Sequence, residues 1–362
     1  MSTKYLSLLK HPLDLLRTKK ILRVNPTADT ARVEPDQIKI FVYDYHNEEV
    51  EQKELKNIED CYKYLDSEKV SWINIDGIRK VEVENVCNHF GIHHLIMDDI
   101  LSVGHRPKMD NIDGTLFCLL SMIYFNDEDG SIETEQISIV LGNNFVISFQ
   151  EEAYKDVFDL LRKKIVLKNS KVRQNKADYL FYSLIDLIVD NYFIVMDKLG
   201  ERIEDLEEDI AHNSNKKTSQ SINILRKEII ILKRTVKPVR DLINGILKSE
   251  SELIEEKTEK YFEDVLDHAI QASELAENYH DMMINLHDLY INNVTLKMNE
   301  IMKVLAIVTC LLAPVAIITG IFGMNFINIP LEQNKDGFLI MLVVMILIPI
   351  WMIFVFKKKN WF

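Results

Sequence analysis

Two long apolar segments near the end of the chain limit its fold more than any other feature. No charged residue occurs from Val304 to Phe322 or from Phe338 to Phe356. At ~1.5 Å per residue, a helix of either length spans most of the ~30 Å hydrocarbon core of a bilayer. Two buried core helices are the alternative, but two such runs at the end of an otherwise polar chain favour membrane spans. The sequence therefore predicts a transmembrane hairpin, with spans at 301–323 and 338–356.

The charges that flank the two spans predict their orientation. Lys297 and Lys303 precede the first span, and lysines begin the basic tail at 357–362. The connecting loop at 324–337 contains a single basic residue, Lys335. Because lysine and arginine favour the cytoplasmic side of a membrane, we expect both termini in the cytoplasm. The expected protein is a multi-pass protein of the inner or plasma membrane.

The composition argues against several classes of function. A net charge of −13 at pH 7 disfavours nucleic acid as a partner, because phosphate binding needs a basic surface. The four cysteines are far apart and lack zinc-ligand spacing, which argues against a zinc finger or a disulfide framework. The sequence contains no nucleophile elbow, phosphate-binding loop or dinucleotide fingerprint. It therefore predicts neither an enzyme nor an organic cofactor.

A cytoplasmic α/β domain is predicted at 36–172, after a basic N-terminal segment at 1–35. Short runs rich in β-branched and aromatic residues predict its strands, and a helical period of apolar residues predicts its helices. Turn sequences between the last three strands predict that these strands are antiparallel neighbours. The predicted strands are 38–45, 70–77, 115–125, 135–142 and 145–150, and the predicted helices are 79–90, 94–102 and 152–168.

Long helices are predicted between this domain and the first span. Apolar residues at three- and four-residue spacing predict an antiparallel helical hairpin at 173–250, with a turn at 212–219 and a kink at Pro238. A stalk helix follows at 251–300, and its pattern continues into the first span as far as Phe322. One helix of ~100 Å cannot lie along a single globular domain. We therefore expect it to enter the membrane and to pack against copies of itself.

One face of this long helix is small or polar almost throughout, even inside the predicted span. Around a symmetry axis, this polar face would line a narrow pore with amide and hydroxyl oxygens. Close helix packing is the alternative, because small residues also concentrate at packing seams. A packing seam needs neither a carboxylate nor an amide at the membrane boundary, so Asp288 and Asn299 favour the pore. The polar face comprises Asp288, Asn292, Thr295, Asn299, Met302, Leu305 or Ala306, Thr309, Ala313, Ala316 and Gly320.

The first span ends in the sequence Gly323-Met324-Asn325. Glycine at a helix end permits a left-handed turn and the close approach of backbones. Asn325 would present a neutral carbonyl oxygen at the mouth of the pore, and copies around an axis would form a ring of such oxygens. Magnesium usually keeps several of its waters. A ring of amides therefore suits hydrated Mg²⁺, whose waters donate hydrogen bonds to the carbonyl oxygens.

These segments resemble a known family. GMNF at 323–326, preceded by ITGIF and followed by a second span that ends in KKKNWF, resembles the CorA family of divalent-cation channels. DDILSVGHRPK (98–108), YFEDVLDH (261–268) and TLKMNEIMKVLAIVT (295–309) are also similar to members of this family. The order of α/β domain, helical hairpin, stalk and two spans agrees with the family over nearly the whole chain.

The resemblance implies a funnel-shaped homopentamer in which five stalk helices surround the pore and the GMN ring forms the outer selectivity filter. It implies a hydrophobic constriction at Met302 and Leu305. The other pore positions that it implies are Asp288 at the cytoplasmic mouth, Asn299, Thr309, Gly320 and Asn325.

The resemblance also implies a regulatory Mg²⁺ site between subunits. Its ligands would be Asp99, in the α/β domain, and Asp264, on the stalk of the neighbouring subunit. The filled site closes the pore, and the empty site loosens the pentamer and lets it conduct. Two carboxylates that meet across an interface repel each other unless a cation lies between them, so the mechanism is metal-linked assembly.

Two departures from the family pattern concern the outer mouth. Phe322 stands where the family usually has tyrosine, so the aromatic ring is kept and its hydroxyl is lost. The loop INIPLEQ (327–333) replaces an acidic sequence typical of the family; Pro330 matches and Glu332 is displaced by one position. A weaker acidic ring is expected to attract cations less strongly, which affects ion capture and selectivity.

The expected function is passive transport of hydrated Mg²⁺, with Co²⁺ and Ni²⁺ as further candidate ions. The expected partners are copies of the chain, membrane lipid and divalent cations. Two alternatives stay open. A ZntB-like member of the wider fold would transport Zn²⁺. In a membrane-anchored metal sensor the α/β domain would bind metal and the hairpin would only anchor it, but an anchor has no use for Asn299 and Asn325.

Overall fold

The computed structural model describes residues 34–359, except 36, 129, 152–156, 213–214, 325–330 and 332–334. Nearly all of the predicted basic segment at 1–35 lies outside the described residues, and so do Asn325, Pro330 and Glu332. The chain divides into two units. One consists of Met1–Glu208 with Gln220–Leu286, and the other of Asp209–Ser219 with His287–Phe362.

A seven-stranded sheet lies in the first unit, in the order β2-β1-β3-β7-β6-β5-β4. β3 and β7 are parallel at its centre, and all other neighbours are antiparallel. The antiparallel pairing of β5, β6 and β7 confirms the prediction for the last three predicted strands. The strands are β1 (Lys39–Tyr45), β2 (Val50–Leu55), β3 (Val70–Asp76), β4 (Lys108–Ile112), β5 (Thr115–Phe125), β6 (Ile132–Leu141) and β7 (Phe145–Gln150).

The two edge strands, β2 and β4, are not predicted by the sequence. Their sequences, VEQKEL and KMDNI, are polar and half-exposed. Charged side chains on an edge strand discourage pairing with other chains. The same side chains explain why the sequence does not predict these strands, because they remove the alternation of apolar and polar residues on which strand prediction depends.

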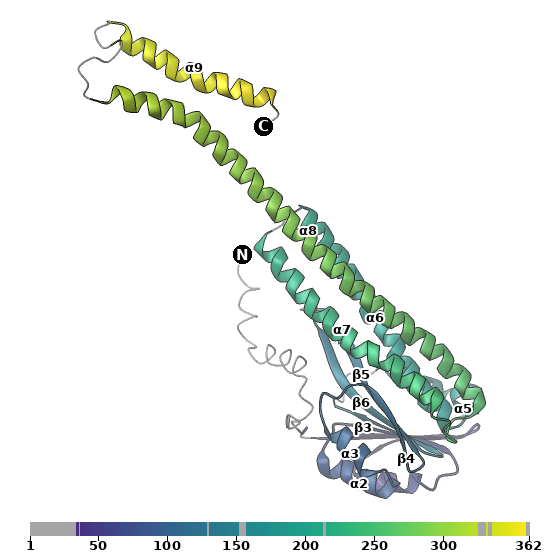
Figure 1. Cartoon of the computed structure of the whole chain (residues 1–362). Coiled ribbons are helices and arrows are strands. Elements are labelled where there is room, and N and C mark those ends of the chain that lie inside the picture. Colours follow the sequence, from purple (N-terminus) through teal and green to yellow (C-terminus); the bar gives the residue numbers. More distant parts are fainter. Residues whose placement is uncertain are drawn as a thin grey trace. The chain divides into compact units, whose positions relative to one another are not determined.

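Helices lie on both sides of the sheet (Figure 1). On one side, α2 (Lys80–Phe90), α3 (His94–Leu101) and the short 3-10 helix η1 (Ile58–Tyr64) pack against apolar side chains of the central strands. The bounds of α2 and α3 agree with the predicted helices within one residue. The helices α6 (Ala177–His212) and α7 (Lys216–Lys248) lie on the other side.

Side chains of α6 bind the backbone of β5 beyond the point where β4 ends. β4 pairs only with the first residues of β5, from Thr115 to Leu119. Further along β5, Tyr192 Oη donates to the carbonyl of Ser121 at 2.8 Å, and Asn191 Nδ2 donates to the carbonyl of Ile123 at 2.6 Å. These bonds pair carbonyl groups of β5 and fix α6 on the sheet.

The predicted helical elements of the first unit are present with adjusted bounds. The helix predicted at 152–168 is α4 (Asp159–Val166), which is shorter, and a single-turn helix, α5 (Lys171–Gln174), follows it. α6 and α7 form the predicted hairpin, but α7 begins at Lys216, inside the predicted turn. α7 also continues through Pro238 without interruption.

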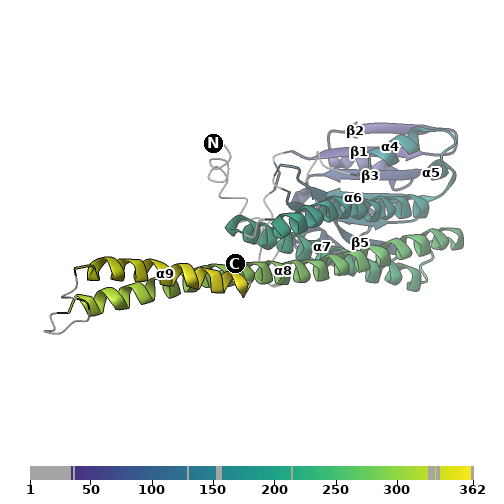
Figure 2. The same cartoon turned by 90° about the horizontal axis from the view of Figure 1, so that it is seen from above.

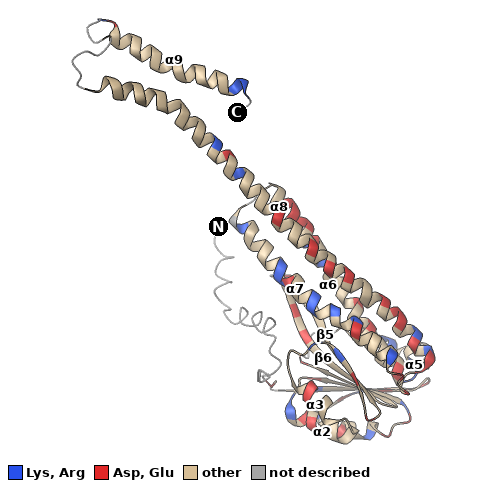
Figure 3. Ribbon diagram, in the orientation of Figure 1, with Lys and Arg blue, Asp and Glu red and all other residues tan. Residues whose placement is uncertain are grey.

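The first part of α8 (Glu256–Phe322) packs on α6 and α7 in the first unit. The rings of Phe181 and Phe262 lie 6.1 Å apart, and Lys233 Nζ on α7 lies 2.6 Å from Glu277 Oε2 on α8. Acidic residues run along α6 and α8, whereas basic residues run along α7 (Figure 3). Opposite charges on adjacent helices therefore accompany the apolar packing between them.

The second unit contains the rest of α8 and α9 (Gly337–Lys358), which runs back in the opposite direction (Figures 1 and 2). Among the described residues, α6, α8 and α9 are long and apolar enough to cross a membrane. Of the most apolar part of α6, 67% is buried inside the protein, against 6% in α8 and 0% in α9. α6 is thus a core helix, whereas the other described residues cover little of the apolar parts of α8 and α9.

Candidate ion pathway and cation sites

The predicted polar face lies on one uninterrupted helix. α8 includes every position of this face from Asp288 to Gly320. These positions follow one another at steps of three or four residues, so they share one side of the helix. Every position of the polar face is exposed in a single chain, whereas Ile307, which is not part of this face, is buried. The polar face is therefore free to meet other copies of the chain.

The polar face begins at Asp288. Its Oδ1 lies 3.7 Å from Nδ1 of His287, and 72% of its side chain is exposed. Asn299 is exposed one turn before the charge-free segment begins. A carboxylate and an amide therefore stand before the apolar part of the helix, where they are available to a hydrated cation.

Two large apolar side chains follow on the same face. Met302 is 51% exposed and Leu305 is 65% exposed, so neither is used for packing within the chain. Thr309, one turn further, donates its hydroxyl hydrogen to the carbonyl of Leu305 at 2.8 Å. The hydroxyl oxygen keeps its lone pairs and can still accept a hydrogen bond from water.

Two glycines, Gly320 and Gly323, lie in the last turns of α8 and at its end. A Cβ added at Gly320 would meet no atom within 4 Å, so another helix can approach closely there. Gly323 and Met324 end the helix with hydrogen bonds from their N–H groups to the carbonyls of Thr319 (2.9 Å) and Ile321 (3.3 Å). Gly323 does not adopt the left-handed conformation that glycine permits, because these bonds continue the helical turn. Asn325, the third GMN residue, lies outside the described residues.

Asp99, one of the two predicted regulatory ligands, already has a cationic partner. It lies on α3, and its Oδ2 is 2.5 Å from Nζ of Lys108, the first residue of β4. The same ammonium lies 3.1 Å from Asp110 Oδ2. Burial acts to lower the pKa of Lys108, but the two carboxylates outweigh burial and raise it. Lys108 is therefore charged at neutral pH.

Asp264, the other predicted ligand, lies exposed on α8 beside a cluster that the sequence does not predict. The cluster consists of Asp186 and Asp190 on α6 and His268 on α8, whose ligand atoms lie within 4.8 Å of one another. Burial raises the pKa of Asp186 to about 6, and the charges of Asp190 and Asp264 act in the same direction. A divalent cation would relieve this repulsion.

The donor set fits a hard divalent cation. Asp99 and Asp264 offer carboxylate oxygens, the ligands that Mg²⁺ prefers. Within one chain the structure does not bring the two together in a cluster of metal ligands among the described residues. In the sequence, only the spacing of Asp186 and Asp190, one turn apart on a predicted helix, could have indicated the second cluster. Their partner, His268, is far away in sequence, so only the packing of α8 on α6 reveals it.

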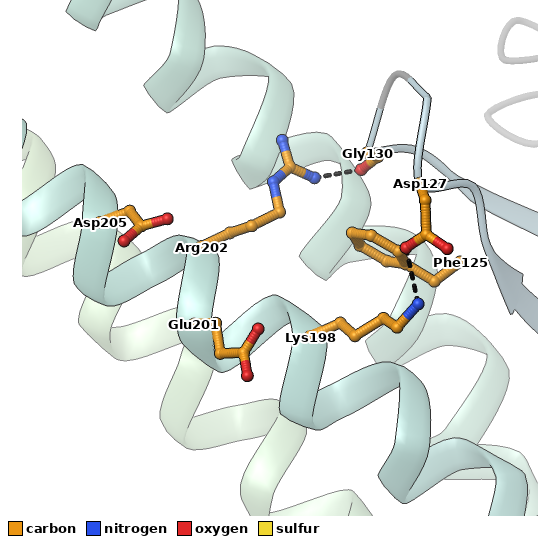
Figure 4. A pocket seen from close by; sticks show the side chains of 7 residues that line it. All are labelled: Phe125, Asp127, Gly130, Lys198, Glu201, Arg202 and Asp205. Atoms are coloured by element: carbon orange, nitrogen blue, oxygen red, sulfur yellow. Dashed lines mark hydrogen bonds and ion pairs between the residues drawn. The ribbon is translucent and has the colours of Figure 1, made fainter.

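A pocket on the first unit is occupied by an ion pair and a hydrogen bond between its own lining residues. α6 and the turn between β5 and β6 line it, and its volume is about 350 Å³ (Figure 4). Lys198 Nζ lies 2.6 Å from Asp127 Oδ1, and Arg202 donates to the carbonyl of Gly130. Both cations also lie over the ring of Phe125. These contacts fix the turn on α6, and we assign the pocket no ligand.

Comparison with known proteins agrees with this geometry. Residues 67–358 match the family model described as CorA-like Mg²⁺ transporter protein. The chain is 37% identical over 347 residues to the cobalt/magnesium transport protein CorA of Thermotoga maritima. This alignment covers 96% of this chain and 98% of that protein. It is 21% identical to the zinc transport protein ZntB of Yersinia enterocolitica, over 82% of this chain and 89% of that protein.

A solved structure shows the same fold. The complete structure of the CorA magnesium transporter from Methanocaldococcus jannaschii matches with a TM-score of 0.75 at 20% sequence identity. The match covers 89% of this chain and 98% of that chain. The sheet-containing domain, the long helices and the final apolar helix therefore follow one architecture.

Proposed function

This chain belongs to the CorA-like Mg²⁺ transporter protein family, and on that premise we propose that it is a passive channel for hydrated Mg²⁺. Co²⁺ is the second candidate ion, because the Thermotoga relative is named a cobalt/magnesium transport protein. Zn²⁺ has less support, since the ZntB protein is 21% identical and the Thermotoga protein 37% identical. The ion moves down its electrochemical gradient.

The continuity of the polar face along α8 is the observation that carries this proposal. One helix brings Asp288, Asn299 and Thr309 into line and continues to the GMN sequence. A membrane-anchored metal sensor needs no such alignment. Within the span, lipid would offer the hydroxyl oxygen of Thr309 no hydrogen-bond donor, whereas a water-filled pore does.

Five copies of α8 around an axis would enclose the pore. The homopentamer, with both termini in the cytoplasm and α8 and α9 in the membrane, is proposed from the family resemblance and the exposed apolar helices. Asn325 would form the outer ring, which holds Mg²⁺ through its waters. Met302 and Leu305 would form the constriction, which closes by excluding water.

The proposed closing signal is cytoplasmic Mg²⁺ bound between subunits. Asp99 of one subunit and Asp264 of the next would hold it. Because a bridging cation offsets the repulsion of two facing carboxylates, it stabilises the assembled, closed form over the open one. A fall in cytoplasmic Mg²⁺ empties the site and opens the channel.

Ion flux into proteoliposomes that contain the purified protein tests the proposed transport. Mg²⁺, Co²⁺ and Zn²⁺ are measured in parallel. Asn325→Ala is expected to reduce Mg²⁺ flux at least about tenfold, because the ring of carbonyl oxygens is lost. Asn334→Ala, which removes an amide from the same loop outside the GMN sequence, is the matched control and is expected to conduct normally.

The outcomes separate the candidate functions. Unchanged Mg²⁺ flux in Asn325→Ala would remove the proposed filter. Zn²⁺ flux without Mg²⁺ flux would assign the protein to the ZntB-like function. No flux of any ion from a properly assembled oligomer would favour the membrane-anchored sensor.

A further inference from the structure

Lys108 lies beside one of the two carboxylates proposed to bind regulatory Mg²⁺. Its Nζ is 2.5 Å from Asp99 Oδ2 and 3.1 Å from Asp110 Oδ2. We propose that Lys108 is an internal cation that competes with Mg²⁺ for Asp99 and thereby sets the Mg²⁺ concentration at which the channel closes. This inference rests on the proposed regulatory site at Asp99.

The turn that joins α3 to β4 holds Lys108 within reach of Asp99. Gln136, a buried residue of β6, donates from Nε2 to the carbonyls of Asp99 at 3.3 Å and Ser102 at 2.9 Å. Its Oε1 accepts a hydrogen bond from the N–H of Gly104 at 3.3 Å. Gln136 therefore fixes the end of α3 and the first part of the turn, and the pairing of Lys108 with Leu119 on β5 fixes its other end. An ion pair on so rigid a backbone loses little conformational freedom when it forms.

The surroundings of Asp99 make a counter-ion necessary. Only 15% of its side chain is exposed, against 38% for Lys108. A carboxylate enclosed in this way is screened less by solvent than a surface carboxylate. An unpaired charge at such a position is unfavourable, so some cation is expected at Asp99 at all times. In the absence of divalent cation, Lys108 fills this role.

Mg²⁺ and the Lys108 ammonium cannot both lie against Asp99 Oδ2 without repelling each other. Asp110 offers the ammonium a second partner at 3.1 Å. When Mg²⁺ binds Asp99, Lys108 can remain paired with Asp110. Both carboxylates and the ammonium therefore keep a partner of opposite charge. The cost of displacing Lys108 weakens Mg²⁺ binding, and the site therefore fills only at higher Mg²⁺ concentration.

The two cations differ in what they link. Lys108 pairs with Asp99 inside one chain, whereas Mg²⁺ would also engage Asp264 of the next subunit. The lysine-bound form consequently lacks the link between subunits and corresponds to the open channel. Lys108 thus acts as a positioning residue for the proposed regulation, without contact with the transported ion.

The test uses the full-length protein and titrates free Mg²⁺ while the resistance of the oligomer to protease is measured. Lys108→Met removes the charge and keeps the length of the side chain. The half-protecting concentration is the free Mg²⁺ concentration at which half of the oligomer resists the protease. Lys108→Met is expected to lower it by about five- to tenfold at low ionic strength, and by less in high salt. The Mg²⁺ concentration that stops Mg²⁺ flux in proteoliposomes is expected to fall by the same factor.

Two matched variants are expected to keep the wild-type concentration. Lys108→Arg retains the charge at the same position. Lys80→Met removes an exposed lysine of α2 that pairs with Glu84 at 3.7 Å, away from Asp99. Melting in EDTA checks that each variant folds, and Lys108→Gln replaces Lys108→Met if that variant does not fold.

An unchanged half-protecting concentration in a folded, neutral variant at position 108 would overturn the proposal, and so would an equal shift in Lys108→Arg. Asp99→Asn distinguishes this failure from failure of the proposed regulatory site. Loss of Mg²⁺ protection in Asp99→Asn with no effect of Lys108→Met would refute only the role of Lys108. Full protection of Asp99→Asn at wild-type Mg²⁺ would refute both.

Discussion

Asp186 shows how burial and charge act together on a single side chain. It is half-buried on α6 and faces Asp190, Asp264 and His268. Burial, reinforced by the two carboxylates, raises its pKa from 3.8 to about 6. The folded protein therefore holds this proton more tightly than the unfolded chain does. The resulting stability is complete below pH 3.8 and is lost as the pH rises through about 6.

Asp186→Asn is expected to stabilise the metal-free protein at pH 7 by about 1–2 kcal/mol, after allowance for solvent screening at this half-buried site. Towards pH 4 the carboxyl group of Asp186 becomes protonated and neutral, as the amide is at every pH. The gain in free energy of unfolding should therefore shrink towards pH 4. Thermal unfolding in EDTA across this pH range measures the effect. Asp197→Asn, an exposed change on the same helix, is the control. Identical pH dependence of wild type and Asp186→Asn would contradict the prediction.

At the scale of elements, α8 binds the tip of the hairpin formed by α6 and α7. The last carbonyl groups of a helix have no partner within the helix. Asn293 Nδ2 donates to the carbonyl of Ile210, near the end of α6, at 3.0 Å, and Tyr290 Oη donates to the carbonyl of Asn215 at 3.4 Å. These residues all lie in the second unit, so the tip is attached to the part of α8 that precedes the membrane segment.

Asn293→Ala is expected to loosen this attachment by about 1 kcal/mol, the typical value of one hydrogen bond. A loss of about 1 kcal/mol raises the equilibrium constant for local opening by about fivefold. Amide hydrogen exchange near the end of α6 should therefore accelerate by about fivefold. Asn285→Ala, an exposed amide elsewhere on α8, serves as the control. Equal exchange rates in the two variants would show that the contact contributes nothing to the stability of the tip.

At the scale of the whole molecule, the apolar parts of α8 and α9 require cover that one chain does not supply. Large apolar side chains on α8, including Leu296, Ile301 and Val304, are more than half exposed. Soluble monomers rarely expose contiguous apolar surface of this extent. In the proposed homopentamer, lipid would cover such side chains on one side of a helix and copies of the chain would cover them on the other.

Asp264→Lys tests regulation at this scale, because the proposed metal site belongs to two subunits. The substitution places a positive charge where the bridging cation would bind, so at least about tenfold more Mg²⁺ should be needed to close the channel. Glu274→Lys makes the same change at another exposed position of α8. Native mass spectrometry should give five times the 42.3 kDa of one chain for both variants. Unaltered Mg²⁺ inhibition in Asp264→Lys would argue against the site.

The sequence by itself determines the features that depend on local patterns. The bounds of α2, α3 and α9 and the end of α8 follow from periodicity and hydropathy within each segment, to within a residue or two, whereas α8 begins five residues after the predicted start of the stalk. Strands β5 and β7 follow in the same way from runs of apolar residues. The polar face of α8 is also visible in the sequence, because a helix repeats at a fixed period whatever lies around it.

Tertiary structure alone decides the features that join separate elements. The cluster of Asp186, Asp190 and His268 exists because α8 packs on α6, and the pairing of Lys108 with Asp99 depends on a turn fixed by Gln136 from another strand. The edge strands β2 and β4 form because neighbouring strands offer them hydrogen bonds, although their own residues are polar. In each case the free energy comes from a contact between different elements, which the residue pattern within one segment does not encode.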